Sequence, residues 1–159
     1  MISSMVEKGG QVKLFKIIRF GVVLVSIIAV TCTFAYAQAA VQKAPEVIYK
    51  GLELYLTKDE SVAVDEWISG GPIPEENARA LVKVFRDLKV AYGKCTGYYV
   101  VGVETVSPTA KVVYVQINYE KGPGYVKFYC YKKAEGWVVT KVDLNSDYES
   151  IVPEYFLKR

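Results

Sequence analysis

The chain has 159 residues, a formal net charge of +3 at pH 7 and no histidine. Without histidine, the Ser-His-Asp triad, the Cys-His pair and the histidine zinc ligand are all excluded, and we expect no metal and no cofactor. Residues 1–37 hold four basic residues and one acidic residue, so the whole net charge lies there and residues 38–159 are neutral. A neutral domain lacks the basic surface that neutralises phosphates, and we therefore expect no nucleic-acid partner.

The first 37 residues have the three parts of a secretory signal peptide. A basic segment at residues 8–19 precedes an uncharged stretch at residues 20–37, and Ala-x-Ala sites end at Ala37 and Ala39. We expect cleavage after Ala37 or Ala39 and export to the periplasm or the extracellular space. The alternative is an uncleaved anchor, because about 18 apolar residues are just enough to span a bilayer. In that case the segment would be the only contact with the membrane.

Residues 38–159 are enough for one domain with its own core and too few for two. Three helices are expected, and they cover residues 44–56, 61–68 and 74–92. Pro45 suits the first turn of the first helix, and Asp59 or Ser61 is available as the N-cap of the second. Gly93 is a C-terminal stop for the third helix, whose broad apolar face includes Val90.

Four strands are expected to follow the helices as an antiparallel meander. They cover residues 98–106, 111–120, 125–132 and 137–144, with turns at residues 107–110, 121–124 and 133–136. Valine and aromatic residues fill these runs, while glycine and proline stand at the breaks. Alternation assigns one set of side chains to the face that packs on the long helix, namely Val113, Val115, Ile117, Tyr119, Val126, Phe128 and Cys130.

This order of elements resembles the NTF2-like superfamily, which includes nuclear transport factor 2, ketosteroid isomerase and many small secreted proteins. The resemblance rests on Trp67, the glycine-rich break at residues 69–72 and the Gly-Trp strand start within residues 135–143. It covers most of residues 38–159. It implies an α+β domain in which three N-terminal helices pack on a curved antiparallel four-strand meander, forming a cone. A cystatin-like domain, with one helix wrapped by a similar meander, is the alternative.

The second face of the meander is the candidate ligand-binding surface. It carries amphipathic rings and amides at Tyr99, Tyr114, Gln116, Asn118, Tyr129 and Tyr131. The other interpretation of these tyrosines is an ordinary half-exposed sheet face. If the sheet curls as in the resembled superfamily, its concave side could form a pocket closed by the helices.

An isomerase in such a pocket would need an acidic base and a paired donor. The acids inside predicted elements near the pocket are Glu104, Asp143, Asp65 and Glu66, and none matches a motif of the resembled superfamily. For Glu104 and Asp143 the simpler interpretation is solvent-facing charge at the end of a sheet.

We expect Cys95 and Cys130 to be unpaired. The meander separates them by roughly 15 Å at about 3.3 Å per residue, and a disulfide tolerates about 7 Å between Cα atoms.

These features predict an exported binding or interaction module without evident catalytic machinery, for a small hydrophobic ligand or a protein partner. One alternative is a ketosteroid-isomerase-like or cyclase-like enzyme that uses a pocket carboxylate and tyrosines. Another is a structural subunit of an envelope assembly, with a homodimer formed through the exposed sheet face.

Overall fold

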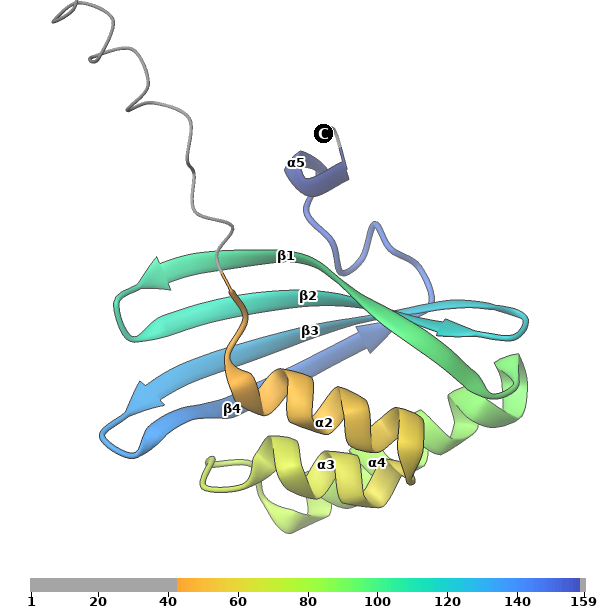
Figure 1. The fold of residues 1–159 in the computed structure, drawn as a ribbon, viewed down its shortest axis with the longest axis horizontal. Coiled ribbons are helices and arrows are strands. Elements are labelled where there is room, and N and C mark those ends of the chain that lie inside the picture. Colours follow the sequence, from red (N-terminus) through yellow and green to blue (C-terminus); the bar gives the residue numbers. More distant parts are fainter. Residues whose placement is uncertain (1–42, 158–159) are drawn as a thin grey trace, which may run out of the picture. The chain divides into compact units, whose positions relative to one another are not determined.

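The computed structural model describes residues 43–157, so the predicted signal segment lies outside the described residues. These residues form an α+β domain in which three helices precede a four-strand sheet, as the sequence predicts (Figure 1). The elements are α2 (Glu46–Thr57), α3 (Glu60–Ile68), α4 (Glu75–Tyr92), β1 (Cys95–Ser107), β2 (Ala110–Tyr119), β3 (Gly122–Lys133), β4 (Gly136–Asn145) and α5 (Glu154–Leu157). Within residues 43–157, none of the helices is long and apolar enough to cross a bilayer.

Local signals at the helix ends explain where the helices begin and end. Asp59 caps α3, because its Oδ1 accepts hydrogen bonds from the backbone N–H groups of Ser61 at 2.9 Å and Val62 at 3.0 Å. Pro74 precedes α4, and Gly93 ends it with a φ of 88°, a left-handed conformation that favours glycine. The predicted cap and stop residues of the second and third helices are therefore confirmed.

The sheet is an antiparallel meander in the order β1-β2-β3-β4. Its central strands are in continuous register from Ala110 opposite Tyr131 to Tyr119 opposite Gly122. The expected turn at residues 121–124 is therefore wrong, because pairing continues to Tyr119 and leaves Glu120 and Lys121 as a two-residue turn. Proline is tolerated near the first residue of a strand, so the glycine and proline of this segment belong to β3.

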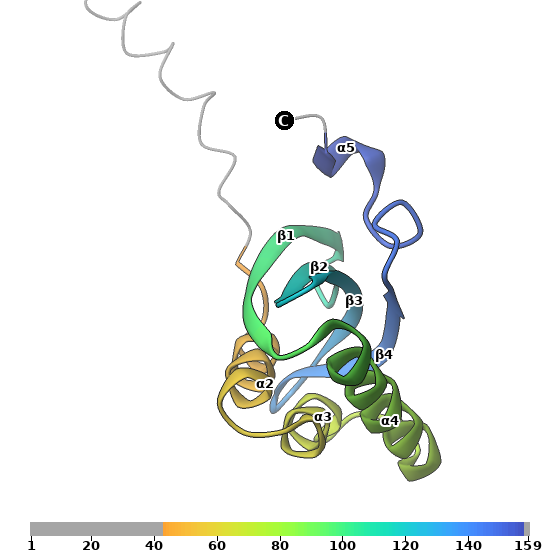
Figure 2. The ribbon, with the colours of Figure 1, turned by 90° about the vertical axis from the view of Figure 1, so that its right-hand side faces the viewer.

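Helices α2, α3 and α4 all lie on one side of the sheet, which we call the helix face (Figure 2). The predicted inward set, from Val113 to Cys130, is buried there. The Trp67 ring of α3 lies 5.0 Å from that of Phe128 and 5.2 Å from that of Phe85. The expected packing of this face on the long helix is only part of the cover, since α4 buries only Ala78 and Phe85 while α2 and α3 also bury residues against it. Val90 was expected on the apolar face of α4 but is 78% exposed.

Trp67 also explains a glycine inside a helix. The indole packs directly on Gly51 of α2, where an added Cβ would overlap the ring, and its Nε1 donates to the carbonyl of Ile48 at 3.3 Å. Glycine inside a helix costs about 1 kcal/mol relative to alanine. Here it permits the close contact between α2 and α3.

A buried tyrosine pair joins the helices to the sheet. The Tyr55 hydroxyl donates to the carbonyl of Phe85 at 3.1 Å and lies 2.9 Å from the Tyr119 hydroxyl. Burial and the hydrogen bond with Tyr119 raise the pKa of Tyr55, so its hydroxyl remains a donor. Lys89 places its amino group 4.2 Å from the centre of the Tyr55 ring and, with Arg86, pairs with Glu60.

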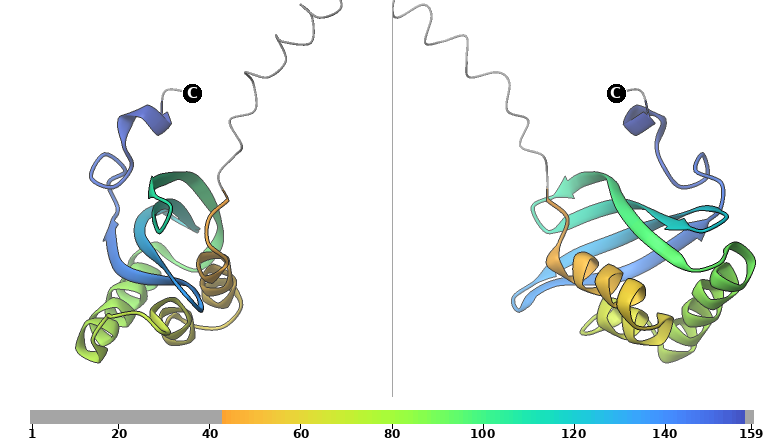
Figure 3. Two further views of the ribbon diagram at one scale, coloured as in Figure 1. Left: turned by 90° about the vertical axis from the view of Figure 1, so that its left-hand side faces the viewer. Right: turned by 45° about the vertical axis from the view of Figure 1, so that its right-hand side comes forward.

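The opposite side, which we call the outer face, is covered by the segment after β4. This C-terminal strap, residues 146–157, crosses the sheet on the side away from the three helices (Figure 3). Its Ile151 and Val152 are buried against Val112 and Tyr114. Tyr114 is only 4% exposed, so the expectation of a half-exposed position for this tyrosine is wrong. The physical reason is the strap, which lies 30 or more residues further along the chain.

Candidate functional site

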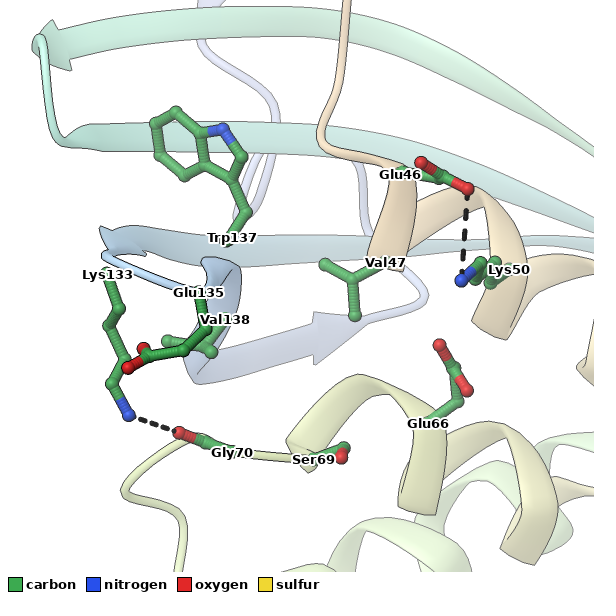
Figure 4. Close-up of a pocket in the computed structure, with 11 residues that line it drawn as sticks. Glu46, Val47, Lys50, Glu66, Ser69, Gly70, Lys133, Glu135, Trp137 and Val138 are labelled. Atoms are coloured by element: carbon green, nitrogen blue, oxygen red, sulfur yellow. Dashed lines mark hydrogen bonds and ion pairs between the residues drawn. The ribbon is translucent and has the colours of Figure 1, made fainter.

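A hollow of about 470 Å³ lies between α2, the end of α3 and the turn that joins β3 to β4 (Figure 4). We call it the hairpin pocket. It is lined by Glu46, Val47, Lys50, Glu66, Ser69, Gly70, Lys133, Glu135, Gly136, Trp137 and Val138. Its volume is within the range of about 300–1,000 Å³ that is usual for small-molecule sites.

Contacts between distant parts of the chain shape this pocket. Lys133, at the end of β3, donates from its Nζ to the carbonyl of Gly70 at 3.0 Å, which ties the hairpin to the segment after α3 (Figure 4). Gly71 follows, and its Cα approaches the backbone of Val139 so closely that an added Cβ would overlap the carbonyl. The pocket therefore lies beside the place where the loop after α3 docks on β4.

Trp137 provides the aromatic wall. It is the first residue after Gly136 at the start of β4 and is partly exposed, whereas Trp67 is 1% exposed in the core. Lys111 places its amino group 5.3 Å from the centre of the Trp137 ring, a cation–π distance, and also donates to the carbonyl of Lys43 at 3.2 Å. Val47 and Val138 complete the apolar part of the wall.

The polar wall carries both signs of charge, with three glutamates and two lysines. Lys50 pairs with Glu46 at 3.8 Å across one turn of α2, and the amino group of Lys133 is turned toward Gly70. The side chains of Glu66 and Glu135 make no hydrogen bond and no ion pair with any described residue.

A second hollow, of about 350 Å³, lies between α4 and β4. It is lined by residues 72–74, by Asn77, Ala80, Leu81 and Val84 of α4, and by residues 140–142 of β4. Its walls are mainly apolar, and Val84 is 41% exposed. We call it the β4 groove.

The six residues of the predicted ligand-binding surface do not line either hollow. Tyr99 and Tyr131 are 65% and 49% exposed. Gln116 donates its amide to Asn118 Oδ1 at 2.7 Å, so these two side chains partly satisfy each other.

Tyr129 and Tyr114, the other two tyrosines of that surface, are held by neighbouring side chains. The amino groups of Lys127 and Lys141 lie 5.3 and 5.0 Å from the centre of the Tyr129 ring. Tyr114 is buried under the strap, and burial together with its hydrogen bond to Glu104 raises its pKa.

The candidate acids are scattered. Glu104 accepts hydrogen bonds from the hydroxyls of Tyr114 and Tyr155, each at 3.0 Å, near the strap. Asp143 pairs with Lys141 at 2.8 Å, and Asp65 is exposed on α3. Only Glu66 lines the hairpin pocket. A carboxylate that faces two tyrosine hydroxyls therefore exists, but it lies outside both hollows.

Cys95 and Cys130 are free thiols in the described part of the chain. Cys95 pairs with Tyr119 and Cys130 with Lys111, so eight residues of β2 separate their positions, roughly 26 Å at about 3.3 Å per residue and further than the roughly 15 Å expected from the sequence. Burial raises the pKa of the Cys130 thiol to about 12, which keeps it protonated and unreactive at neutral pH.

Sequence reasoning missed Trp137, Glu135 and Lys133 as site residues, because they stand at a hairpin that only folding brings next to α2 and α3. Residues 43–157 contain no group of three or more cysteine, aspartate or glutamate side chains that could hold a metal ion. Comparison with protein-family models, with curated proteins and with solved structures finds no match to this chain.

Proposed function

We propose that the chain is an exported, non-catalytic binding module of the NTF2-like kind, and that it holds a small ligand in the hairpin pocket. The observation that carries the proposal is the position of Trp137, whose large ring is partly exposed beside a hollow of about 470 Å³. Trp137 packs against the core cluster yet stays partly exposed, and partly exposed aromatic rings commonly line binding sites. The element order of helices and then a meander supports the NTF2-like kinship, and the basic and apolar leader supports export.

The closed core favours binding at the rim of the fold over chemistry in its interior. Trp67, Tyr55, Phe85 and Phe128 are each at most 1% exposed and fill the space between the helices and the sheet. An isomerase-type mechanism requires a carboxyl group inside a closed apolar pocket. Glu104, which does contact tyrosines, lies on the outer face.

Tryptophan fluorescence provides a direct test, because the chain has only two tryptophans. A library of small molecules is screened by thermal shift, and compounds that raise Tm are titrated while emission is recorded. A ligand of the hairpin pocket changes the emission of Trp137 and leaves that of Trp67 unchanged, so the signal disappears in Trp137→Phe.

A matched pair of variants tests which of the two hollows binds the ligand. Ser69→Phe fills the hairpin pocket from its exposed rim, and Asn77→Phe fills the β4 groove in the same way. We expect binding to be lost in Ser69→Phe and retained in Asn77→Phe. The reverse result would contradict the assignment of the binding site to the hairpin pocket. So would a ligand that binds the wild type, Ser69→Phe and Asn77→Phe with equal affinity.

A further inference from the structure

The charges around the hairpin pocket differ in how far they are already satisfied. Both lysines of the wall have partners, since Lys50 pairs with Glu46 and Lys133 donates to the carbonyl of Gly70. Glu66 and Glu135 have no partner among the described residues. Glu66 and Glu135 are therefore the charged groups of the wall that have no partner among the described residues, and the wall carries one more carboxylate than amine.

These two carboxylates come from separate elements. Figure 4 shows Glu66 rising from α3 toward α2, while Glu135 lies on the hairpin beside Val138. A cation in the hollow would thus meet acceptors from two sides of the fold. Hydrogen bonds from an ammonium group to a carboxylate are shorter and stronger than those between neutral groups.

The aromatic wall is suited to the uncharged part of a ligand. The amino group of Lys111 already lies 5.3 Å from the centre of the Trp137 ring, so a cation–π partner is present before any ligand enters. A second cation at that ring would be repelled by Lys111. The indole and the two valines therefore offer contact area to an apolar or aromatic body.

We propose that the ligand class of the hairpin pocket is a small organic ammonium with an apolar or aromatic body. The ammonium group is bound by Glu66 and Glu135, and the body lies against Trp137, Val47 and Val138. This inference rests on the proposed binding function and adds the charge and the shape of the ligand.

Three probes that share a phenyl ring test the sign of the charge. They are 2-phenylethylammonium, the neutral 2-phenylethanol and the anionic 3-phenylpropionate, each titrated against the purified full chain with Trp137 emission as the readout. We expect the ammonium probe to bind at least about tenfold more tightly than the anion. Its affinity should fall between low salt and about 0.5 M salt, because exposed charges are screened.

Single substitutions then test the two carboxylates. We expect Glu66→Gln and Glu135→Gln each to raise the Kd of the ammonium probe by about two- to fivefold, as is usual for exposed or partly exposed charge contacts. Glu76→Gln on α4 is the matched control, since Glu76 is exposed and lies outside both hollows, and it should leave the Kd unchanged.

The outcomes separate this inference from the function on which it rests. If the anion or the alcohol binds as tightly as the ammonium, or if neither glutamine variant changes the Kd, the proposed ligand class is wrong. The proposal that the hairpin pocket binds a ligand is then unaffected. The ligand class is also wrong if all three probes fail while a library compound binds in a manner sensitive to Ser69→Phe. If nothing binds in the hollow, the proposed function itself fails.

Discussion

The two faces of the sheet are covered by different kinds of structure. On the helix face, three helices bring Trp67, Tyr55 and Phe85 onto Phe128, and all four side chains are fully buried. On the outer face, the cover is the C-terminal strap, which buries a smaller cluster around Val112 and Tyr114 and leaves exposed tyrosines beside it.

This difference shows what strand alternation can and cannot indicate. Alternation places Val113 and Tyr114 on opposite faces, which the structure confirms. It does not indicate which face is covered, because the cover comes from other parts of the chain. The helices that cover one face have their own periodic apolar pattern, whereas the strap at residues 146–157 has only short apolar segments.

The largest expected effect is on the helix face. Trp67→Ala removes the ring that contacts α2, α4 and β3, and we expect it to lower the free energy of unfolding by about 3–5 kcal/mol. The measurement is urea unfolding followed by circular dichroism. Trp137→Ala is the matched control, and its loss should be smaller because Trp137 is partly exposed. Equal losses of unfolding free energy in the two variants would contradict the distinction between a core tryptophan and a partly exposed one.

The strap is expected to contribute less. The Phe156 ring packs on Gly102 and lies 5.3 Å from the Tyr114 ring, but Phe156 remains partly exposed. We therefore expect Phe156→Ala to cost about 2 kcal/mol, below the range for fully buried phenylalanine. Unfolding in urea measures this loss, with Tyr155→Phe as the control, because it keeps its ring and loses only an exposed hydrogen bond to Glu104, at a cost of at most about 1 kcal/mol. A loss as large as that of Trp67→Ala would show that both faces are equally important for stability.

A pH-dependent effect is expected where two of the covering helices are joined. The hydrogen bond from Arg86, together with Lys89, lowers the pKa of Glu60 despite its partial burial. The stability from a carboxyl with a lowered pKa is present above its unfolded-state pKa and is lost as the pH falls through the folded-state value. Glu60→Gln should therefore cost about 1 kcal/mol at pH 7, since Arg86 is exposed and screened, and less at pH 3.

This prediction is checked by comparing urea unfolding of the wild type and Glu60→Gln across pH 3–7. Glu76→Gln, whose side chain is exposed on α4, should follow the wild-type curve. A difference between wild type and Glu60→Gln that stays constant over this range would mean that the ion pair does not cause the effect.

The smallest effects are expected at the exposed part of the outer face. Tyr99→Ser and Tyr131→Ser should change the free energy of unfolding by less than about 0.5 kcal/mol, because both side chains are largely exposed. Neither should alter binding in the hairpin pocket. Loss of ligand binding with unchanged stability would instead place the ligand on the outer face, as the strand alternation predicts.

Much of the fold could be predicted because its signals are local. Asp59 and Gly93 mark helix ends through their own backbone geometry, and the alternation from Val113 to Phe128 reflects a strand with one buried face. The role of Gly51, in contrast, could not be predicted from local signals. In the sequence it only weakens a helix, and its role is visible once the Trp67 indole is found packed on it.

The sequence alone determined the order of the elements, the inward face of the sheet and the absence of histidine chemistry, because each depends on residue type or on neighbours within a few positions. The tertiary structure decided that the strap covers Tyr114 and that Glu66, Glu135 and Trp137 surround one hollow. Those residues lie up to 71 positions apart, and no local pattern encodes how a hairpin and two helix ends meet in space. The packing of Trp67 against α2 and β3 helps to position the helices relative to the sheet, and therefore the elements that line the hairpin pocket.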